Sequence, residues 1–305
     1  MSKAVVALDK SKASYPSLCR DERVQPFLKW AGGKRQLIPT IRSFVPENYR
    51  VYFEPFIGAG AIFFELQPAI ATINDANSEL INCYRVIKKL PNELIQHAIS
   101  HPINRKYFYR VRSLDREAAF RTLSPIERAS RVIFLNKTCY NGLFRVNSKG
   151  QFNVPFGKYT EPKVVDPVVI MAVSKYLNAA KVTILNQDFA KVLAAARRDD
   201  FIYLDPPYDP LSDTSSFTGY NLHSFGRDEQ RRLKAVCDDL HHKGCKLLLS
   251  NSATRFIREL YSDKSKYTII DVHANRNINS VGTSRGRISE LLIFNNYELP
   301  KKKRC

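Results

Sequence analysis

The sequence predicts an open, doubly wound α/β fold in which helices cover both faces of a sheet. Three observations support this. Short β-rich runs alternate with helical patterns along most of the chain, an order typical of sheets with helical connections. A glycine turn stands directly between the first such run and the helix that follows it. The hydrophobic fraction of 44% and the charged fraction of 25% are those of an ordinary globular protein.

The first elements surround the glycine turn. Residues 51–56 are expected to form a strand, the turn occupies residues 57–60, and a helix follows it. The apolar run 71–73 is expected to form the second strand, which ends at Asn74 and Asp75. A strand, a tight turn and a helix in this order are typical of the ligand-binding edge of a doubly wound sheet.

Further strands are expected in the second half of the chain, at residues 181–185, 201–204, 246–249, 268–272 and 290–294. A helix is expected over residues 228–242, between two of these strands. Its apolar residues fall at the i, i+3, i+4 and i+7 positions from Leu233, and Gly244 is placed to end it.

Residues 79–163 break this rhythm. They are rich in Arg, Lys, Asn and Tyr, mostly helical in pattern, and loop-like from Lys137 onward. We therefore expect an inserted second domain that is more helical and more basic than the sheet. The expected division of the chain is a loose arm (1–26), the sheet domain (27–78 and 164–300), the inserted domain (79–163) and a basic tail (301–305).

The charge balance indicates a polyanionic partner. The chain has 48 Lys and Arg residues against 29 Asp and Glu, a formal net charge of +19. Such an excess suits binding to a phosphate backbone. No stretch approaches the roughly 20 apolar residues that a membrane span needs, so no membrane partner is expected. The six cysteines form no CxxC pair, which predicts reduced thiols in the cytosol and no metal site.

The segment 53–60, Phe-Glu-Pro-Phe-Ile-Gly-Ala-Gly, predicts a nucleoside-binding turn. Gly58 and Gly60 allow close approach of a ligand, and the helix after them presents free N–H groups. Asp75 follows the next strand, where an acidic side chain can bind ribose hydroxyls. Phe63 stands where a dinucleotide-binding motif has its third glycine, which favours a ligand without a pyrophosphate. Alternatively, the glycines serve only the turn.

A second segment, 27–34, contains the single Trp of the chain, Trp30, beside two glycines and Lys34. This tryptophan could simply pack in the core. It could equally cover a planar or sulfonium-bearing ligand, because an aromatic face attracts positive charge.

The tetrapeptide Asp205-Pro206-Pro207-Tyr208 follows the expected strand 201–204, at the edge where open α/β sheets place their chemistry. The N6 of adenine is a poor nucleophile because its lone pair is delocalised into the ring. The Asp205 carboxylate and the Pro206 carbonyl could each accept one of its N–H groups, and Tyr208 could stack on a flipped base. The alternative is a Pro-Pro turn with an Asp cap.

Together these residues resemble the Dam-type DNA adenine-N6 methyltransferases, which methylate adenine within GATC. The similarity runs from about Pro26 to Asn296. It rests on the segments FLKWAGGK (27–34), FEPFIGAGAIF (53–63), NDAN (74–77), YNGLFRVNSKGQFNVPFGKY (140–159), DPPYDPLSDTSSFTGY (205–220) and SRGRISELLIF (284–294). It implies a Rossmann-like methyltransferase sheet that uses S-adenosylmethionine, with an inserted, mostly helical DNA-recognition domain.

The resemblance also implies roles for individual residues. The cofactor pocket would be formed by Trp30, Lys34, Glu54, Gly58, Gly60, Asp75, Asp188, Phe189 and Asp205. Catalysis would fall to Asp205, Pro206, Pro207 and Tyr208, and residues 215–220 would flank the substrate base. Double-stranded DNA would be contacted by Lys29, Tyr140, Asn141, Leu143, Arg145 and Pro155. Among these, Arg145 would bind a guanine, as an Arg fork can.

Phe144 and Lys137 stand where relatives have smaller or different residues, which leaves the exact recognition sequence open. Two other functions remain as alternatives: the same chemistry on an RNA base or a protein glutamine, and a non-catalytic DNA-binding protein. We expect a monomer in the bacterial cytoplasm, associated with the nucleoid. Roles in DNA replication, mismatch repair or restriction–modification are all compatible with the sequence.

Overall fold

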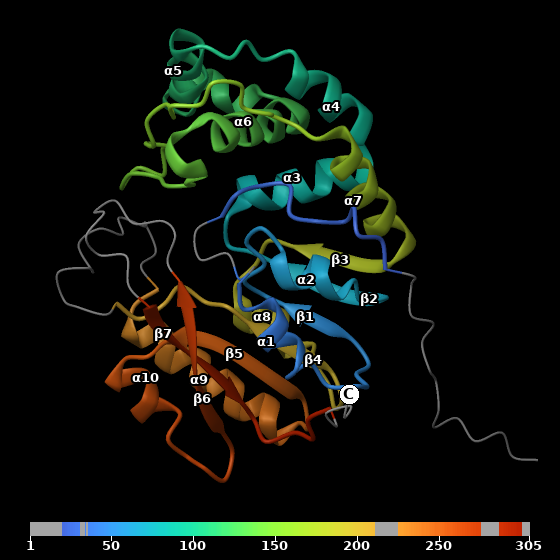
Figure 1. The fold of residues 1–305 in the computed structure, drawn as a ribbon, viewed down its shortest axis with the longest axis vertical. Coiled ribbons are helices and arrows are strands. Elements are labelled where there is room, and N and C mark those ends of the chain that lie inside the picture. The colour runs from blue at the N-terminus through green and yellow to red at the C-terminus, as the bar shows by residue number, and fades with distance from the viewer. Residues whose placement is uncertain (1–19, 31–33, 35, 211–224, 276–286, 301–305) are drawn as a thin grey trace, which may run out of the picture.

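The computed structural model describes residues 20–30, 34, 36–210, 225–275 and 287–300. Within these ranges seven strands form one sheet in the order β3-β2-β1-β4-β5-β7-β6. The strands are β1 (Tyr52–Glu54), β2 (Ile70–Asn74), β3 (Lys181–Leu185), β4 (Phe201–Leu204), β5 (Lys246–Ser252), β6 (Thr268–Asn275) and β7 (Arg287–Phe294). Only the pairs that β7 makes with β5 and β6 are antiparallel. The expected α/β, Rossmann-like fold is confirmed (Figure 1).

Five strands differ in length from the prediction, and three of these, β2, β6 and β7, are longer than predicted. β1 is shorter than residues 51–56, because the chain turns away at Pro55. β5 runs on to Ser252, since its polar end pairs with β7, from Ser250 opposite Leu292 to Ser252 opposite Glu290. This polar end has no apolar strand pattern, so the sequence did not indicate it.

Side chains alternate along each strand and so point to both faces of the sheet, and helices bury both faces. Tyr52 and Phe201 join the core on one face, and their neighbours Phe53 and Ile202 join the core on the other. The first face is covered by α2 (Ala61–Leu66), α3 (Ser78–Lys89) and α7 (Pro167–Ala179), with the short α1 (Ile38–Arg42) beside them. The second is covered by α8 (Phe189–Ala194), α9 (Arg227–His242) and α10 (Arg255–Leu260).

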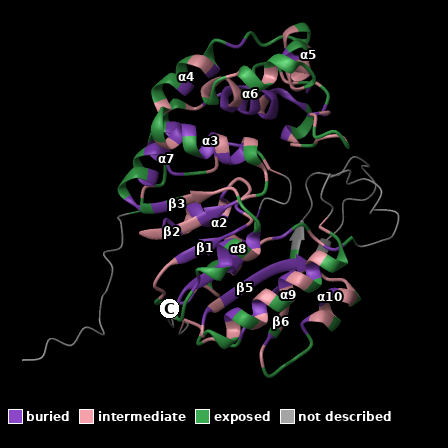
Figure 2. Cartoon of the chain, turned by 180° about the vertical axis from the view of Figure 1, so that it is seen from behind, coloured by how far each residue is buried: buried purple, intermediate pink, exposed green. Residues whose placement is uncertain are grey.

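A helical layer lies beyond the β3 edge of the sheet (Figure 1). It consists of α4 (Pro91–Ile99), α5 (Arg105–Ser113), the 3₁₀ turns η1 (Leu114–Arg116) and η2 (Ala118–Thr122), and α6 (Pro125–Thr138). A capping box of Ser124 and Glu127 starts α6, which is largely buried in the centre of the layer (Figure 2). Asn82 on α3 donates to the carbonyl of Pro125 on α6 at 2.8 Å, so α3 links the layer to the sheet. The domain boundaries at residues 79 and 163 stay a prediction.

After α6 the chain forms what we call the hairpin segment (residues 139–157), which begins with the 3₁₀ turn η3 (Tyr140–Gly142). Isolated bridges join Cys139 to Phe156 and Val146 to Phe152. The segment lies at one side of the helical layer (Figure 1), and its end returns to α6, where the Gly157 N–H donates to the Thr138 carbonyl at 2.8 Å.

Residues 20–26, which the sequence assigned to a loose arm, contact the end of α2. Gln67 accepts the Asp21 N–H at 3.1 Å, and Val24 is 5% exposed. The remainder of the arm (1–19) and the basic tail (301–305) lie outside the described residues. No helix in the described ranges is long and apolar enough to cross a membrane.

Candidate active site

The turn between β1 and α2 requires glycine at two positions. Gly58 has φ +49° and Gly60 has φ +73°, a region that side chains disfavour. A Cβ atom on Gly60 would lie 2.7 Å from the Tyr84 hydroxyl, and one on Gly58 would lie 3.0 Å from Cδ1 of Trp30. The Trp30 indole therefore lies directly against the backbone of the turn.

Asp75 follows β2 and holds this turn from the side. Its Oδ2 atom accepts the Gly58 N–H at 3.0 Å and its Oδ1 atom accepts the Asn77 N–H at 2.9 Å. Burial raises the pKa of Asp75, and the two N–H groups oppose this shift. A carboxylate has about four acceptor sites, so these two bonds leave capacity for ribose hydroxyls. The turn, Asp75 and Trp30 thus fit a nucleoside ligand.

Glu54, the last residue of β1, lies behind the turn. Its side chain is 2% exposed, and its Oε2 atom accepts the Tyr52 hydroxyl at 2.6 Å. Burial raises its pKa well above the usual value, and the nearby charge of Asp205 adds to this effect.

The residues after β4 form a connected polar chain. Nζ of Lys34 lies 2.9 Å from Oδ1 of Asp205 and 4.8 Å from the ring centre of Tyr208. The Tyr208 hydroxyl donates to Oε2 of Glu290 at 2.8 Å. Lys34 and Asp205 were both predicted site residues, and the structure brings them into direct contact. Glu290 was missed, and its only sequence signal is a carboxylate within the apolar run of β7.

The loop after Asp205 is anchored by a buried network that sequence reasoning also missed. Gln230 and Asn251 are fully buried and hydrogen-bonded to each other at 3.1 Å. Gln230 donates to the Pro207 carbonyl at 2.9 Å, and Asn251 accepts the Asp209 N–H at 3.3 Å. Gln230 thus binds the carbonyl of Pro207 and not that of Pro206, which is the predicted acceptor for the adenine amino group. Polar residues at the end of an apolar strand were the available signal.

Asp188 and Phe189 follow β3 and stand at the start of α8. The Asp188 carboxylate caps α8 by accepting the Ala190 N–H at 3.0 Å, and it forms an ion pair with Arg232. Phe189 is 5% exposed and packs against Phe56, with ring centres 5.4 Å apart. A contact between Asp188 and the cofactor stays a prediction.

The predicted DNA-contacting residues gather around the hairpin segment. Tyr140 donates its N–H to the Pro155 carbonyl at 2.9 Å, and Tyr140 is 45% exposed. The Lys29 side chain packs against the turn at Gly142, where a Cβ atom would come within 2.4 Å of it. Arg145 is exposed. The remaining two, Asn141 and Leu143, are neighbours of this turn in the chain, and residues 215–220 lie outside the described residues.

An aromatic contact joins the predicted cofactor pocket to the hairpin segment. Trp30 stacks on Phe144 of the hairpin segment, with ring centres 5.1 Å apart and planes inclined by 21°. The Trp30 indole therefore contacts both the glycine turn and the hairpin segment. The sequence singled out Phe144 only as a departure from relatives.

Residues 30–278 match the family described as D12 class N6 adenine-specific DNA methyltransferase. The chain is 45% identical over 274 residues to the type II methyltransferase M1.LlaDCHI of Lactococcus lactis subsp. cremoris, covering 89% of this chain and 95% of that protein. It is 40% identical over 292 residues to the type II methyltransferase M.MjaIII of Methanocaldococcus jannaschii, covering 89% and 99%. It is 34% identical over 268 residues to the DNA adenine methylase of Escherichia coli K12, covering 88% and 94%.

Proposed function

The chain belongs to the D12 class of N6 adenine-specific DNA methyltransferases, and from this premise we propose that it methylates adenine within GATC in double-stranded DNA by base flipping. The protein is an adenine-specific DNA methyltransferase, and its methyl donor is S-adenosylmethionine. The observation that carries the catalytic part of the proposal is the Lys34–Asp205 ion pair at the carboxyl end of β4, next to the strand that leads into the glycine turn.

S-Adenosylmethionine supplies a methyl group attached to a positively charged sulfur. In the proposal, Asp75 binds the ribose hydroxyls, and the turn at Gly58 and Gly60 lets the ligand approach the backbone closely. The Trp30 indole faces this turn, where an aromatic ring stabilises positive charge. Glu54, buried at the end of β1, completes the proposed cofactor pocket.

The proposed catalytic groups are those of the loop after β4. Asp205 and the carbonyl of Pro206 each accept an N–H group of the adenine N6, which turns the nitrogen lone pair away from the ring. Tyr208 stacks on the flipped base, and its hydrogen bond to Glu290 restricts the tilt of its ring. Gln230, which binds the Pro207 carbonyl, helps to hold the loop in place.

Replacing Lys34 by Met is expected to move the acid limb of the pH profile of kcat to higher pH. Burial raises the pKa of Asp205, and the Lys34 ammonium is the largest contribution that opposes this shift. Without the ammonium, the carboxyl is protonated at a higher pH, and the ionised acceptor is lost earlier on acidification. The profile would be recorded at saturating cofactor and DNA. Lys34→Arg keeps the charge and should keep the wild-type limb; an unchanged limb in both variants would contradict this role.

The GATC assignment rests on the residues of the hairpin segment and its neighbour Lys29. In the proposal, Arg145 binds a guanine through O6 and N7, while Leu143 and Pro155 contact bases, where an apolar side chain suits a thymine methyl. Tyr140 and its neighbour Asn141 fill the space that the flipped adenine leaves. Lys29 contacts the outer guanine. The proposal also assigns target recognition to residues 79–163, and it includes a monomeric enzyme that works in the cytoplasm.

The test is the transfer of labelled methyl from S-adenosylmethionine to a duplex with one GATC site. We expect N6-methyladenine in this duplex, and far less in a duplex with one base pair of the site exchanged or in RNA of the same sequence. A 2-aminopurine at the target adenine should become more fluorescent on binding, because flipping unstacks it. Equal methylation of both duplexes would reject the GATC assignment. Methylation of the RNA alone would reject double-stranded DNA as the substrate.

A further inference from the structure

The hairpin segment has little secondary structure of its own to hold its shape. Within the described residues its two arms are joined by isolated bridges, from Val146 to Phe152 and from Cys139 to Phe156, rather than by paired strands. A two-stranded hairpin is only marginally stable by itself in water. A fixed shape for this segment therefore requires contacts from the helices behind it.

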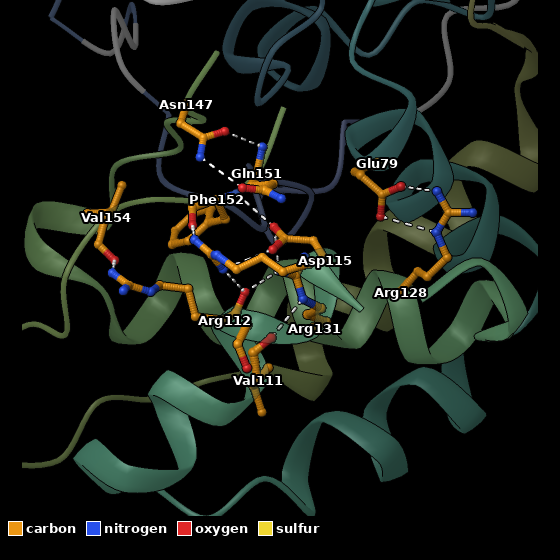
Figure 3. Close-up of polar contacts among 12 residues, drawn as sticks. Glu79, Val111, Arg112, Asp115, Arg128, Arg131, Asn147, Gln151, Phe152 and Val154 are labelled. Carbon is orange, nitrogen blue, oxygen red and sulfur yellow. Dashed lines mark hydrogen bonds and ion pairs between the residues drawn. The ribbon is translucent and has the colours of Figure 1, made fainter. Parts of the chain in front are cut away.

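Asp115, in η1, supplies the most buried of these contacts (Figure 3). Its Oδ2 atom accepts the Phe152 N–H at 2.7 Å and lies 2.8 Å from Nη2 of Arg131 on α6. Its Oδ1 atom lies 3.0 Å from Nη1 of Arg116. The side chains of Asp115 and Arg131 are only 9% and 5% exposed. Each charge of this buried pair therefore depends on the other for compensation.

Two arginines bind carbonyl groups on the same arm. Arg116 donates to the Phe152 carbonyl at 2.9 Å, and Arg112 donates to the Val154 carbonyl at 3.2 Å. Arg131 also donates to the Arg112 carbonyl at 3.0 Å, so these contacts form one connected set (Figure 3). Both backbone polar groups of Phe152 are thereby held. We call this set the clamp, which consists of Asp115, Arg131, Arg116 and Arg112.

The clamp acts on Arg145 through one intervening residue, Asn153. Phe152 and Val154 are buried, and Asn153 between them is partly exposed, as alternation along an extended chain requires. Asn153 accepts the Nε–H of Arg145 at 2.8 Å and donates its N–H to the Arg145 carbonyl at 3.1 Å. The Nε–H is used in this way, so a guanine would be bound by the two Nη groups.

We propose that the residues of the clamp are positioning residues for sequence recognition. By fixing residues 152–154, the clamp sets the orientation of Asn153 and hence of the Arg145 guanidinium toward a guanine in the DNA major groove. This inference rests on the proposed role of Arg145 in the proposed function. It adds a group that touches no base and that nevertheless determines selectivity.

The test measures kcat/KM on the duplex that the wild type prefers and on a duplex with the proposed Arg145 guanine replaced. The selectivity ratio is kcat/KM on the preferred duplex divided by kcat/KM on the altered duplex. Arg145→Ala is expected to lower this ratio by a factor on the order of ten, and the other variants are compared with it. Asp115→Ala and Arg116→Ala should lower the same ratio, while the Kd of S-adenosylmethionine stays at its wild-type value. Asp115→Asn keeps an acceptor for the Phe152 N–H and should restore part of the ratio.

Glu79→Gln is the matched control. Glu79, on α3, forms an ion pair with Arg128 on α6 (Figure 3), and its charge also acts on Arg131 without a hydrogen bond to it. The Glu79→Gln substitution therefore removes an ion pair to the helix that carries Arg131, and it leaves every contact between the clamp and the hairpin segment in place. The ratio of this variant should equal that of the wild type.

The inference is overturned if Asp115→Ala and Arg116→Ala lower kcat/KM equally on both duplexes, or if Glu79→Gln lowers the ratio as much. Should Asp115→Ala fail to fold, Arg116→Ala decides alone, because the Arg116 side chain is 33% exposed and leaves the buried pair intact. A wild-type preference for a site other than GATC would reject the proposed specificity. The selectivity ratio measured at that other site would still test the role of the clamp. An unchanged ratio in Arg145→Ala would overturn the route through Arg145.

Discussion

Asp205→Ala is expected to lower kcat for methyl transfer by a factor on the order of 10³ while duplex DNA remains bound. The carboxylate is the only charged acceptor in the proposed contact to the adenine amino group. Its loss leaves the nitrogen lone pair in conjugation with the ring. Single-turnover transfer of labelled methyl measures the chemical step, and fluorescence anisotropy of a labelled duplex measures DNA binding.

The same substitution leaves the Lys34 ammonium without its carboxylate partner. Lys34 is 5% exposed, so the loss of its close counter-charge is expected to lower the free energy of unfolding. Asp205→Asn keeps an oxygen beside Lys34, and the double variant Lys34→Met/Asp205→Ala removes the ammonium as well. Both should unfold at higher temperature than Asp205→Ala and still be nearly inactive. Loss of DNA binding together with activity in all three variants would instead indicate a structural role.

Asp75→Ala is expected to raise the Kd of S-adenosylmethionine by a factor on the order of 10². The substitution removes the proposed acceptor of the ribose hydroxyls. It also removes the acceptor of the Gly58 and Asn77 N–H groups, so the turn loses an anchor. Isothermal titration calorimetry with the cofactor in the absence of DNA gives the affinity directly.

Asn77→Ala is the control for a change in stability near the same turn. The Asn77 side chain caps α3 by accepting the Leu80 N–H at 3.1 Å, whereas its backbone N–H binds Asp75 and is retained in alanine. This variant should lose about 1 kcal/mol of stability and keep the cofactor affinity. Similar weakening in both variants would mean that Asp75 acts only by stabilising the loop.

Much of the fold could be predicted because its signals are local. The strand runs and the helix after Gly226 have apolar periodicities that each segment carries by itself. The motif at Asp205 was found because its residue types suit amino-group chemistry and because it directly follows an apolar strand. The polar end of β5 was not found, because its place in the sheet depends on pairing with β7, a segment distant in the sequence.

Local sequence by itself therefore determined the α/β class, the glycine turn, the candidate acids at the ends of β2 and β4, and the basic character of the chain. Only the tertiary structure decided which of these residues meet. It paired Lys34 with Asp205, placed Glu290 against Tyr208, and set Asp115 behind the hairpin segment. The physical reason is that the composition and periodicity of a segment report its burial and local conformation. Ion pairs and hydrogen bonds between distant segments depend on how the sheet and its helices pack.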